Sequence, residues 1–127
     1  MRFLTPLMFI IAGIIHLLPL AGVLGAERLQ MLYGITVSDP NLEIILRHRA
    51  VMFGIVGGYL CVAAFRPEMQ INALVIGFLS VLTFIGLALL VGQYNEQIRR
   101  VIVADVVALV CLVIATVMVA LKHRQQQ

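Results

Sequence analysis

Apolar positions along the chain are gathered into four long runs that short polar stretches separate. The runs cover about residues 3–24, 40–65, 70–92 and 101–121. A helix needs ~20 apolar residues to cross the hydrocarbon core of a bilayer, and each run reaches that length. The pattern therefore predicts an all-α integral membrane protein, a four-helix antiparallel bundle, in which residues 1–127 form a single transmembrane domain.

Prolines mark places where these helices should bend or begin. Pro19 removes a backbone donor within the first run, which predicts a kink in the second half of that helix. Asp39 and Pro40 predict the start of the second helix, because aspartate is a good cap and proline suits the first helical position. Arg66 and Pro67 predict a tight turn into the third helix, since the residue before a proline disfavours helix.

The longest polar stretch, residues 26–39, connects the first two runs. It is too short and too mixed in composition to cross a bilayer. Residues 26–33 predict a short interfacial helix, which Gly34 should end. Its apolar side chains are expected on the lipid side: Leu29, Leu32 and Tyr33.

The composition is far more apolar than that of a soluble enzyme. Apolar residues make up 62% of the chain and charged residues 12%, with a mean hydropathy of +1.08, whereas soluble domains are about 45–50% apolar and about 25% charged. The formal charge of +3 comes from basic residues at the ends of the runs rather than in one cluster, so we expect no nucleic-acid partner. The two cysteines show no metal-ligand spacing, so we expect neither a metal nor another cofactor.

Basic residues at the two ends of the helices bear on membrane orientation. With four spans, both termini and the middle turn share one side, which carries Arg2, Arg66, Lys122 and Arg124. The opposite side carries Arg28, Arg47, Arg49, Arg99 and Arg100. If Arg47 and Arg49 are left out because their helix enters the bilayer, the positive-inside rule favours cytoplasmic termini. We therefore predict a multi-pass protein with both termini in the cytoplasm.

Charged residues at the start of the second run point to a polar site at one end of the bundle. Glu43 and Arg47 are four residues apart, the spacing at which opposite charges attract on a helix. Arg47 shares its helix face with the small residues Ala50, Gly54, Gly58 and Cys61. A stripe of small residues lets another helix approach closely, so we expect Arg47 to point towards the protein interior.

Asp105 lies inside the fourth run, where an ionised carboxylate costs several kcal/mol unless it is paired. In a four-span bundle, the starts of the second and fourth runs lie in the same leaflet. We therefore predict an ion pair between Asp105 and Arg47 or Arg49, with Arg99 and Arg100 within reach through neighbouring turns. Such a pair is compatible with either a structural role, fixing the register of the helices, or a ligand-binding or catalytic role.

His16 lies near the predicted middle of the first span, three residues before Pro19. One interpretation is a core hydrogen bond from the imidazole to a backbone group or to a polar side chain of another span: Ser80, Thr83 or Thr116. The other makes His16 a proton carrier, or the polar floor of a pocket that reaches down from Arg47 and Asp105. The sequence is compatible with both.

A family resemblance is carried by the first half of the chain. The stretch LYGITVSDPNLEIILRHRAVMFGIVGG, residues 32–58, followed by AAFRP up to Pro67, resembles small four-span bacterial inner-membrane proteins grouped loosely with the DoxX-like proteins. The resemblance is most specific at RHRA and the glycines that follow. It implies a four-helix antiparallel bundle in the bacterial cytoplasmic membrane. Many members of the group have no assigned role, so the resemblance brings no catalytic residues to this chain.

Three functions are compatible with these residues. The first is a binding or accessory module, in which a polar pocket holds a lipid headgroup or an amphiphile, or docks a larger membrane protein. We expect its site to include Glu43, Arg47, Arg49, Arg99, Asp105 and His16. The second is a membrane enzyme that acts on an apolar substrate with His16 or Asp105 as acid or base. The third is a small proton-coupled transporter with His16 as the proton site.

Several other functions lack the motifs they need. The chain has no HExxH or GxxxxGK[ST] motif and no CxxC pair of the kind that a disulfide-forming quinone enzyme needs. Small multidrug exporters of similar length need a carboxylate in the middle of the first span, and none is present here. The expected partners are membrane lipids and, through the small residues Ala88 and Gly92, a second copy of the chain or a larger membrane protein.

Overall fold

The computed structural model describes residues 2–127, which are all-helical and contain no strand. The helices, in chain order, are α1 (Leu4–Leu17), η1 (Leu18–Leu24), α2 (Ala26–Tyr33), α3 (Pro40–Ala63), η2 (Pro67–Met69), α4 (Gln70–Val91) and α5 (Glu96–Gln125). Four continuous helical stretches are long and apolar enough to cross a membrane: Leu4–Leu24, Pro40–Ala63, Pro67–Val91 and Glu96–Gln125. The predicted four long apolar helices are therefore confirmed by length and composition.

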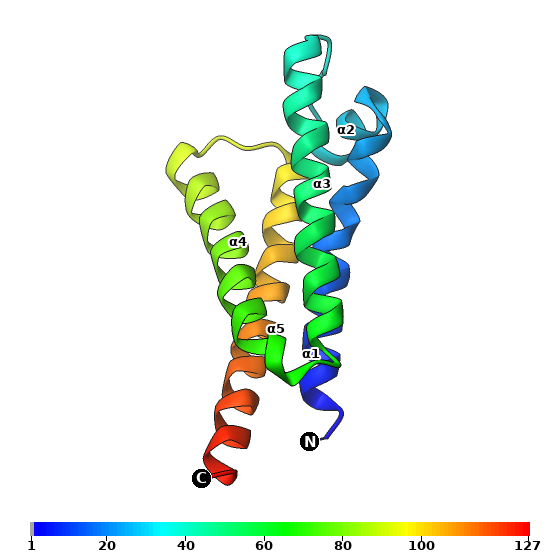
Figure 1. The fold of residues 1–127 in the computed structure, drawn as a ribbon. Helices are drawn as coiled ribbons and strands as arrows, with labels where there is room; N and C mark the ends of the chain where they lie inside the picture. Colours follow the sequence, from blue (N-terminus) through cyan, green and yellow to red (C-terminus); the bar gives the residue numbers. More distant parts are fainter. Residues whose placement is uncertain (1) are drawn as a thin grey trace.

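The four long helices alternate in direction along the chain (Figure 1). Helix α1 packs against α3 and α5, and α4 packs against α5 and α3. The two termini and the turn between α3 and α4 lie at one end, while α2 lies at the opposite end beside η1 (Figure 1). This arrangement brings the start of α3 and the start of α5 to the same end of the molecule.

The first long helix changes its geometry near Pro19. Helix α1 ends at Leu17, and the chain continues as the 3-10 helix η1, with Pro19 in its first turn. Proline has no backbone N–H to donate to the preceding turn, which accounts for the change. The predicted kink therefore takes the form of a transition from α to 3-10 helix.

Capping residues define the beginnings of α3 and α5. Asp39 caps α3 as predicted, because its side chain accepts a hydrogen bond of 2.9 Å from the backbone N–H of Asn41. Asn95 caps α5 in the same way, accepting a bond of 2.8 Å from the N–H of Ile98. Helix α5 therefore begins five residues before the predicted start at Val101, a difference that the cap explains.

Helix α2 has its predicted bounds but not its predicted environment. Gly34 ends it in the left-handed conformation, with φ 65°, as expected. Leu29 is completely buried and Tyr33 is 4% exposed, while Leu32 is partly buried, so the prediction of a lipid-facing side chain was wrong for Leu29 and Tyr33. The reason is that Gly22 of η1 leaves room for Leu29: a Cβ added at Gly22 would lie 2.8 Å from the leucine Cδ2.

The close approach predicted for the small residues of α3 occurs between α3 and the first long helix. A Cβ added at Gly54 would lie 2.7 Å from Leu20 Cδ1, and one added at Gly57 would lie 2.8 Å from the carbonyl oxygen of Gly13. A Cβ at Gly58 would meet nothing within 4 Å. The contact is therefore confirmed at Gly54, while Gly57 takes the place predicted for Gly58.

Candidate functional site

A cavity of about 240 Å³ lies between the first long helix, α2, α3 and α5. Its walls are mainly apolar and include Ile15, Pro19, Met31, Phe53 and Ala104. Its polar lining residues are Tyr33, Gln97, Arg100 and Asp105. The cavity therefore combines an apolar body with a small set of polar groups, the usual composition of a ligand site.

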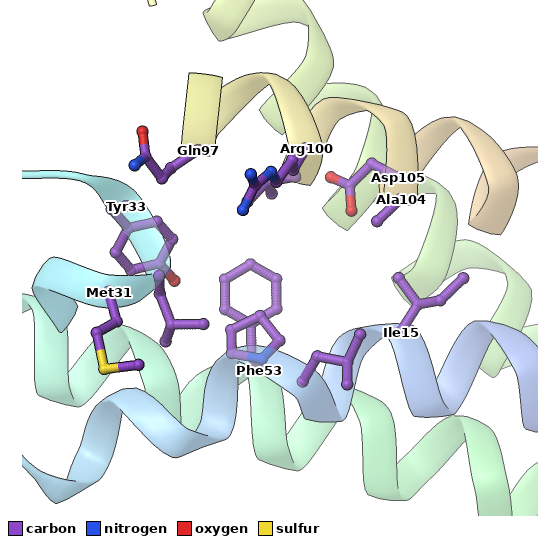
Figure 2. A pocket seen from close by; sticks show the side chains of 12 residues that line it. Ile15, Met31, Tyr33, Phe53, Gln97, Arg100, Ala104 and Asp105 are labelled. Carbon is purple, nitrogen blue, oxygen red and sulfur yellow. The ribbon is translucent and has the colours of Figure 1, made fainter. Parts of the chain in front are cut away.

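Helix α5 supplies most of the polar groups because their spacing places them on one face. Gln97, Arg100 and Asp105 follow at offsets of three and eight residues, and the intervening lining residues, Val101 and Ala104, fill the same face. Figure 2 shows these α5 side chains on one side of the cavity, with Tyr33, Phe53 and Ile15 across from them. The site is thus built between one face of α5 and the helices opposite.

Asp105 is the buried charge of this cavity. Asp105 is 5% exposed. Its side chain forms no ion pair and no hydrogen bond within residues 2–127. Every fully inaccessible side-chain oxygen or nitrogen in that range forms a hydrogen bond. Because the Asp105 oxygens form none, they must be accessible from the cavity, into which Figure 2 shows the carboxylate pointing.

Arg49 lies near Asp105 but is held by aromatic residues. Its Nη1 donates a hydrogen bond of 2.6 Å to the hydroxyl of Tyr33. Its guanidinium carbon lies 5.1 Å, 4.6 Å and 5.4 Å from the ring centres of Tyr33, Phe53 and Phe84, within the range of cation–π attraction. The predicted ion pair between Arg49 and Asp105 is absent, because these groups hold the guanidinium.

Arg47 does not pair with Asp105, and that alternative was wrong. Its Nε donates a 2.9 Å hydrogen bond to the carbonyl oxygen of Val23, and its Nη1 lies 3.4 Å from Oε1 of Glu43. The predicted pair with Glu43 is therefore confirmed, but the Arg47 side chain is 47% exposed, so the prediction that it points towards the protein interior was wrong. Because Arg47 and Arg49 are about 200° apart around α3, only Arg49 can face α5 while Arg47 reaches η1.

His16 is buried in the core and does not line the cavity. One ring nitrogen, Nδ1, lies 2.8 Å from the carbonyl oxygen of Ala12 and so donates to it. The other, Nε2, lies 3.0 Å from Ser80 Oγ and accepts from that hydroxyl in the neutral imidazole. The predicted core hydrogen bond is confirmed, with Ser80 as the partner, and both nitrogens are occupied.

The remaining predicted site residues lie outside the cavity. Glu43 and Arg47 form their pair on an exposed part of α3, and Arg99 pairs with Glu96 at 3.6 Å on an exposed part of α5. Asp105 lines the cavity and Arg49 supports it through Tyr33 and Phe53. The structure thus brings together Asp105 and Arg49 but separates both from the other four.

Of the residues that line the cavity, only Asp105 was among the predicted site residues; those not predicted include Tyr33, Phe53, Gln97 and Arg100. Gln97 and Arg100 could have been predicted from their helical spacing to Asp105, since offsets of eight and five residues return to the same broad face. The same spacing places Arg100, rather than its neighbour Arg99, on the side of the helix that carries Gln97. No comparable signal exists for Tyr33 and Phe53, because they come from other helices.

Helix α2 is tied over the cavity from two sides. Asn95 Nδ2 donates hydrogen bonds to the backbone carbonyl oxygens of Tyr33, at 2.7 Å, and Gly34, at 3.3 Å. Arg49 binds the Tyr33 hydroxyl from the α3 side. The C-terminal end of α2 therefore depends on one residue of α3 and one residue that caps α5.

Two other hollows lie elsewhere in the molecule. An apolar groove of about 610 Å³ runs between α4 and α5, and a cavity of about 720 Å³ between Arg2 and Lys122 lies at the end that holds the termini. Neither contains a buried charged side chain. Among residues 2–127, no group of three His, Cys, Asp or Glu side chains could hold a metal ion. Asp105 therefore distinguishes its cavity from the rest.

No known protein family, characterised protein or solved structure matches this chain. The function must therefore be argued from the chemistry of the cavity itself. An ionised carboxylate can only accept hydrogen bonds, a guanidinium can only donate them, and the Gln97 amide can do both. Together with the apolar walls, these groups can hold a molecule that has a polar head and an apolar body.

Proposed function

We propose that the four long helices form an antiparallel bundle across a membrane. The support is their length, their apolar composition and the alternating direction of the chain. Following the resemblance to DoxX-like proteins and the positive-inside count, the proposed location is the bacterial inner membrane with both termini in the cytoplasm. The cavity then lies between the bilayer centre and the opposite surface, where α2 packs beside η1.

Within this bundle, we propose that the protein is a binding module for an amphiphile. The observation that carries the proposal is the Asp105 carboxylate, which is buried, unpaired and directed into a cavity. Burying such a group without a partner costs free energy, and an intramembrane ionisable residue usually marks a functional site. A ligand that donates to the carboxylate would supply the missing partner.

The rim of the cavity is consistent with entry from the lipid phase. Leu18 and Met31 line the cavity and are nevertheless 60% and 66% exposed. Both are large apolar side chains on the first long helix and on α2. An amphiphile could therefore place its head inside while its tail stays among the lipids.

The enzymatic and transport alternatives have less support. Transport needs His16 as the proton site, and an enzyme that uses His16 and Asp105 together needs both residues to face one cavity. His16 is outside the lining, however, and its two ring nitrogens are occupied by Ala12 and Ser80. Phe53, whose ring centre lies 6.0 Å from that of His16, lines the cavity in its place.

Photolabelling with a diazirine-bearing fatty acid tests the proposal. In the wild-type protein the label should attach to Leu18 and Met31, as peptide mass spectrometry would show. Ala104→Phe fills the cavity from α5 and should abolish this labelling. Val113→Phe, which adds the same side chain at an exposed position of α5, should leave it unchanged. Equal labelling of wild type and Ala104→Phe would contradict the proposal.

A further inference from the structure

We propose that the ligand is a single-chain lipid with an anionic head group and a free hydroxyl between that head and its tail, the chemistry of a lysophospholipid. This inference rests on the proposed binding function and specifies its ligand. It assigns the anionic group to Arg100 and the hydroxyl to Asp105. Each assignment follows from the partners that these side chains lack.

Arg100 is an exposed cation that lines the cavity. It forms no ion pair within residues 2–127, whereas the neighbouring Arg99 is paired with Glu96. A guanidinium binds phosphate or carboxylate through two parallel hydrogen bonds. Gln97 lies one turn away on the same face and can add a donor. This end of the cavity therefore suits an anionic head group.

Asp105 needs a donor, and the surrounding charges favour a neutral one. The carboxylate accepts no hydrogen bond from residues 2–127; the cation Arg100 lines the same cavity, and the cation Arg49 contacts its lining residues Tyr33 and Phe53. No second acid lines the cavity. An ammonium group would add a third positive charge beside one carboxylate. A hydroxyl donates a hydrogen bond to the carboxylate without changing the net charge of the cavity.

The order of the two groups along α5 matches the order of groups in a lysophospholipid. Asp105 is five residues further from the start of α5 than Arg100, which is about 7.5 Å along the helix axis. In the proposed orientation, Asp105 is therefore the deeper of the two. A lysophospholipid entering from the bilayer presents its phosphate, then its free hydroxyl, then its acyl chain, in that order from the surface inwards.

The size of the cavity favours one chain. Sites that enclose a whole drug-sized ligand usually have a volume of about 300–1,000 Å³, and this cavity has about 240 Å³. It can therefore take a head group and the first part of one chain. The exposed Leu18 and Met31 at the rim leave a path by which the rest of the chain can stay in lipid.

Four probes separate these features when they are titrated against the full-length protein in a non-ionic detergent. Oleoyl lysophosphatidic acid has all the proposed features, its 2-deoxy analogue lacks the hydroxyl, and monooleoylglycerol lacks the phosphate. Dioleoyl phosphatidic acid has a second chain in place of the hydroxyl. Lysophosphatidic acid should bind at least about tenfold more tightly than each of the others, as expected for one charge-assisted hydrogen bond or ion pair.

Variants then assign each feature to a residue. Asp105→Leu should weaken lysophosphatidic acid about tenfold and leave the 2-deoxy analogue unchanged, since only the former has a hydroxyl to lose. Arg100→Gln should weaken lysophosphatidic acid by a similar factor and leave monooleoylglycerol unchanged. Arg99→Gln is the matched control and should alter no probe. Asp105→Asn keeps the shape of the side chain and should give an intermediate loss.

The outcomes separate this inference from the proposed function. Equal affinity for lysophosphatidic acid and either single-chain analogue would overturn the inference, as would a uniform loss for all probes in Asp105→Leu and Arg100→Gln. In those cases Ala104→Phe would still block the fatty-acid label, so the binding function would stand. If Ala104→Phe changed neither labelling nor affinity, the proposed function itself would fail.

Discussion

At the scale of single residues, Asp105 and Arg49 have opposite charges, lie near each other and are not in contact. Arg49 is stabilised by the Tyr33 hydroxyl and by three aromatic rings. Aromatic faces and a phenol compensate a guanidinium for part of its lost hydration. The carboxylate has no such compensation, and its burial therefore opposes folding of the free protein.

Replacing Asp105 by leucine should stabilise the free protein. The substitution removes a buried, unpaired carboxylate and adds apolar volume beside an existing cavity, so we expect a gain of roughly 1–3 kcal/mol in the free energy of unfolding. Thermal unfolding in detergent, followed by helical circular dichroism, measures the change. A lower midpoint for Asp105→Leu would show that the carboxylate already has a stabilising partner in the free protein.

Replacing Tyr33 by phenylalanine should destabilise the protein by about 1.5 kcal/mol, because Arg49 loses a hydrogen-bond acceptor and keeps the ring. Tyr94→Phe is the control, since Tyr94 is 42% exposed and its hydroxyl forms no hydrogen bond within residues 2–127. Denaturant unfolding of both variants gives the comparison. Equal effects of the two substitutions would mean that the Arg49 contact contributes nothing.

At the scale of helices, α2 covers the cavity through a small number of contacts. Leu29 packs into the space left by Gly22, Asn95 binds the backbone at the end of α2, and Arg49 binds the Tyr33 side chain. A helix of eight residues is too short to be stable alone in water. Its order therefore depends on these neighbours.

Asn95→Ala should loosen α2 although the substitution lies outside that helix. It removes the cap of α5, which costs about 1 kcal/mol, and both hydrogen bonds to the end of α2. Amide hydrogen exchange over residues 26–33 should become faster. Asn72→Ala serves as the control, because Asn72 is exposed and its side chain forms no hydrogen bond within residues 2–127. Unchanged exchange in Asn95→Ala would exclude the tether.

Adjacent glycines of α3 should respond oppositely to alanine. Gly57→Ala should destabilise the protein by about 1–3 kcal/mol, because the new Cβ would meet the Gly13 carbonyl oxygen and Leu17. Gly58→Ala adds its Cβ to open space and should stabilise α3 by up to about 1 kcal/mol. Thermal unfolding of the pair tests the contact. Stabilisation by both substitutions would show that α1 and α3 are not in close contact at Gly57.

At the scale of the whole molecule, the two ends differ in how their cations are used. At the end with the termini, Arg2, Lys122 and Arg124 are exposed, and Arg66 pairs only with Glu68. At the other end Arg47, Arg49 and Arg99 are engaged by neighbouring groups, whereas Arg28 and Arg100 are exposed and form no ion pair within residues 2–127. Three unpaired cations at the terminal end against two at the other favour the proposed cytoplasmic termini by one charge, since Lys and Arg set membrane orientation.

Reporter fusions should therefore place the C-terminus in the cytoplasm. Green fluorescent protein fused after Gln127 should fluoresce, and alkaline phosphatase at the same position should be inactive. Alkaline phosphatase inserted after Thr36, between α2 and α3, should be active. The reverse pattern would contradict the orientation and leave the description of the cavity unchanged.

Much of the helical framework follows from local sequence. Apolar runs near the length of a bilayer predict long helices, and the cap at Asp39 and the left-handed Gly34 lie where local chemistry requires them. These features depend on neighbouring residues and on the solvent that surrounds the chain, so the order of residues is enough to predict them. The start of α5 differs from the predicted one because the Asn95 cap begins the helix before the apolar run.

The cavity depends on how the helices are rotated and how closely they approach. Whether Arg47 or Arg49 faces α5 is decided by the contact of α3 with the first long helix at Gly54 and Gly57. That contact joins residues distant in sequence, and the same packing places Tyr33 beside Arg49 and leaves Asp105 unpaired. Periodicity shows which residues share one helix face, but the partner of that face is set by packing between helices.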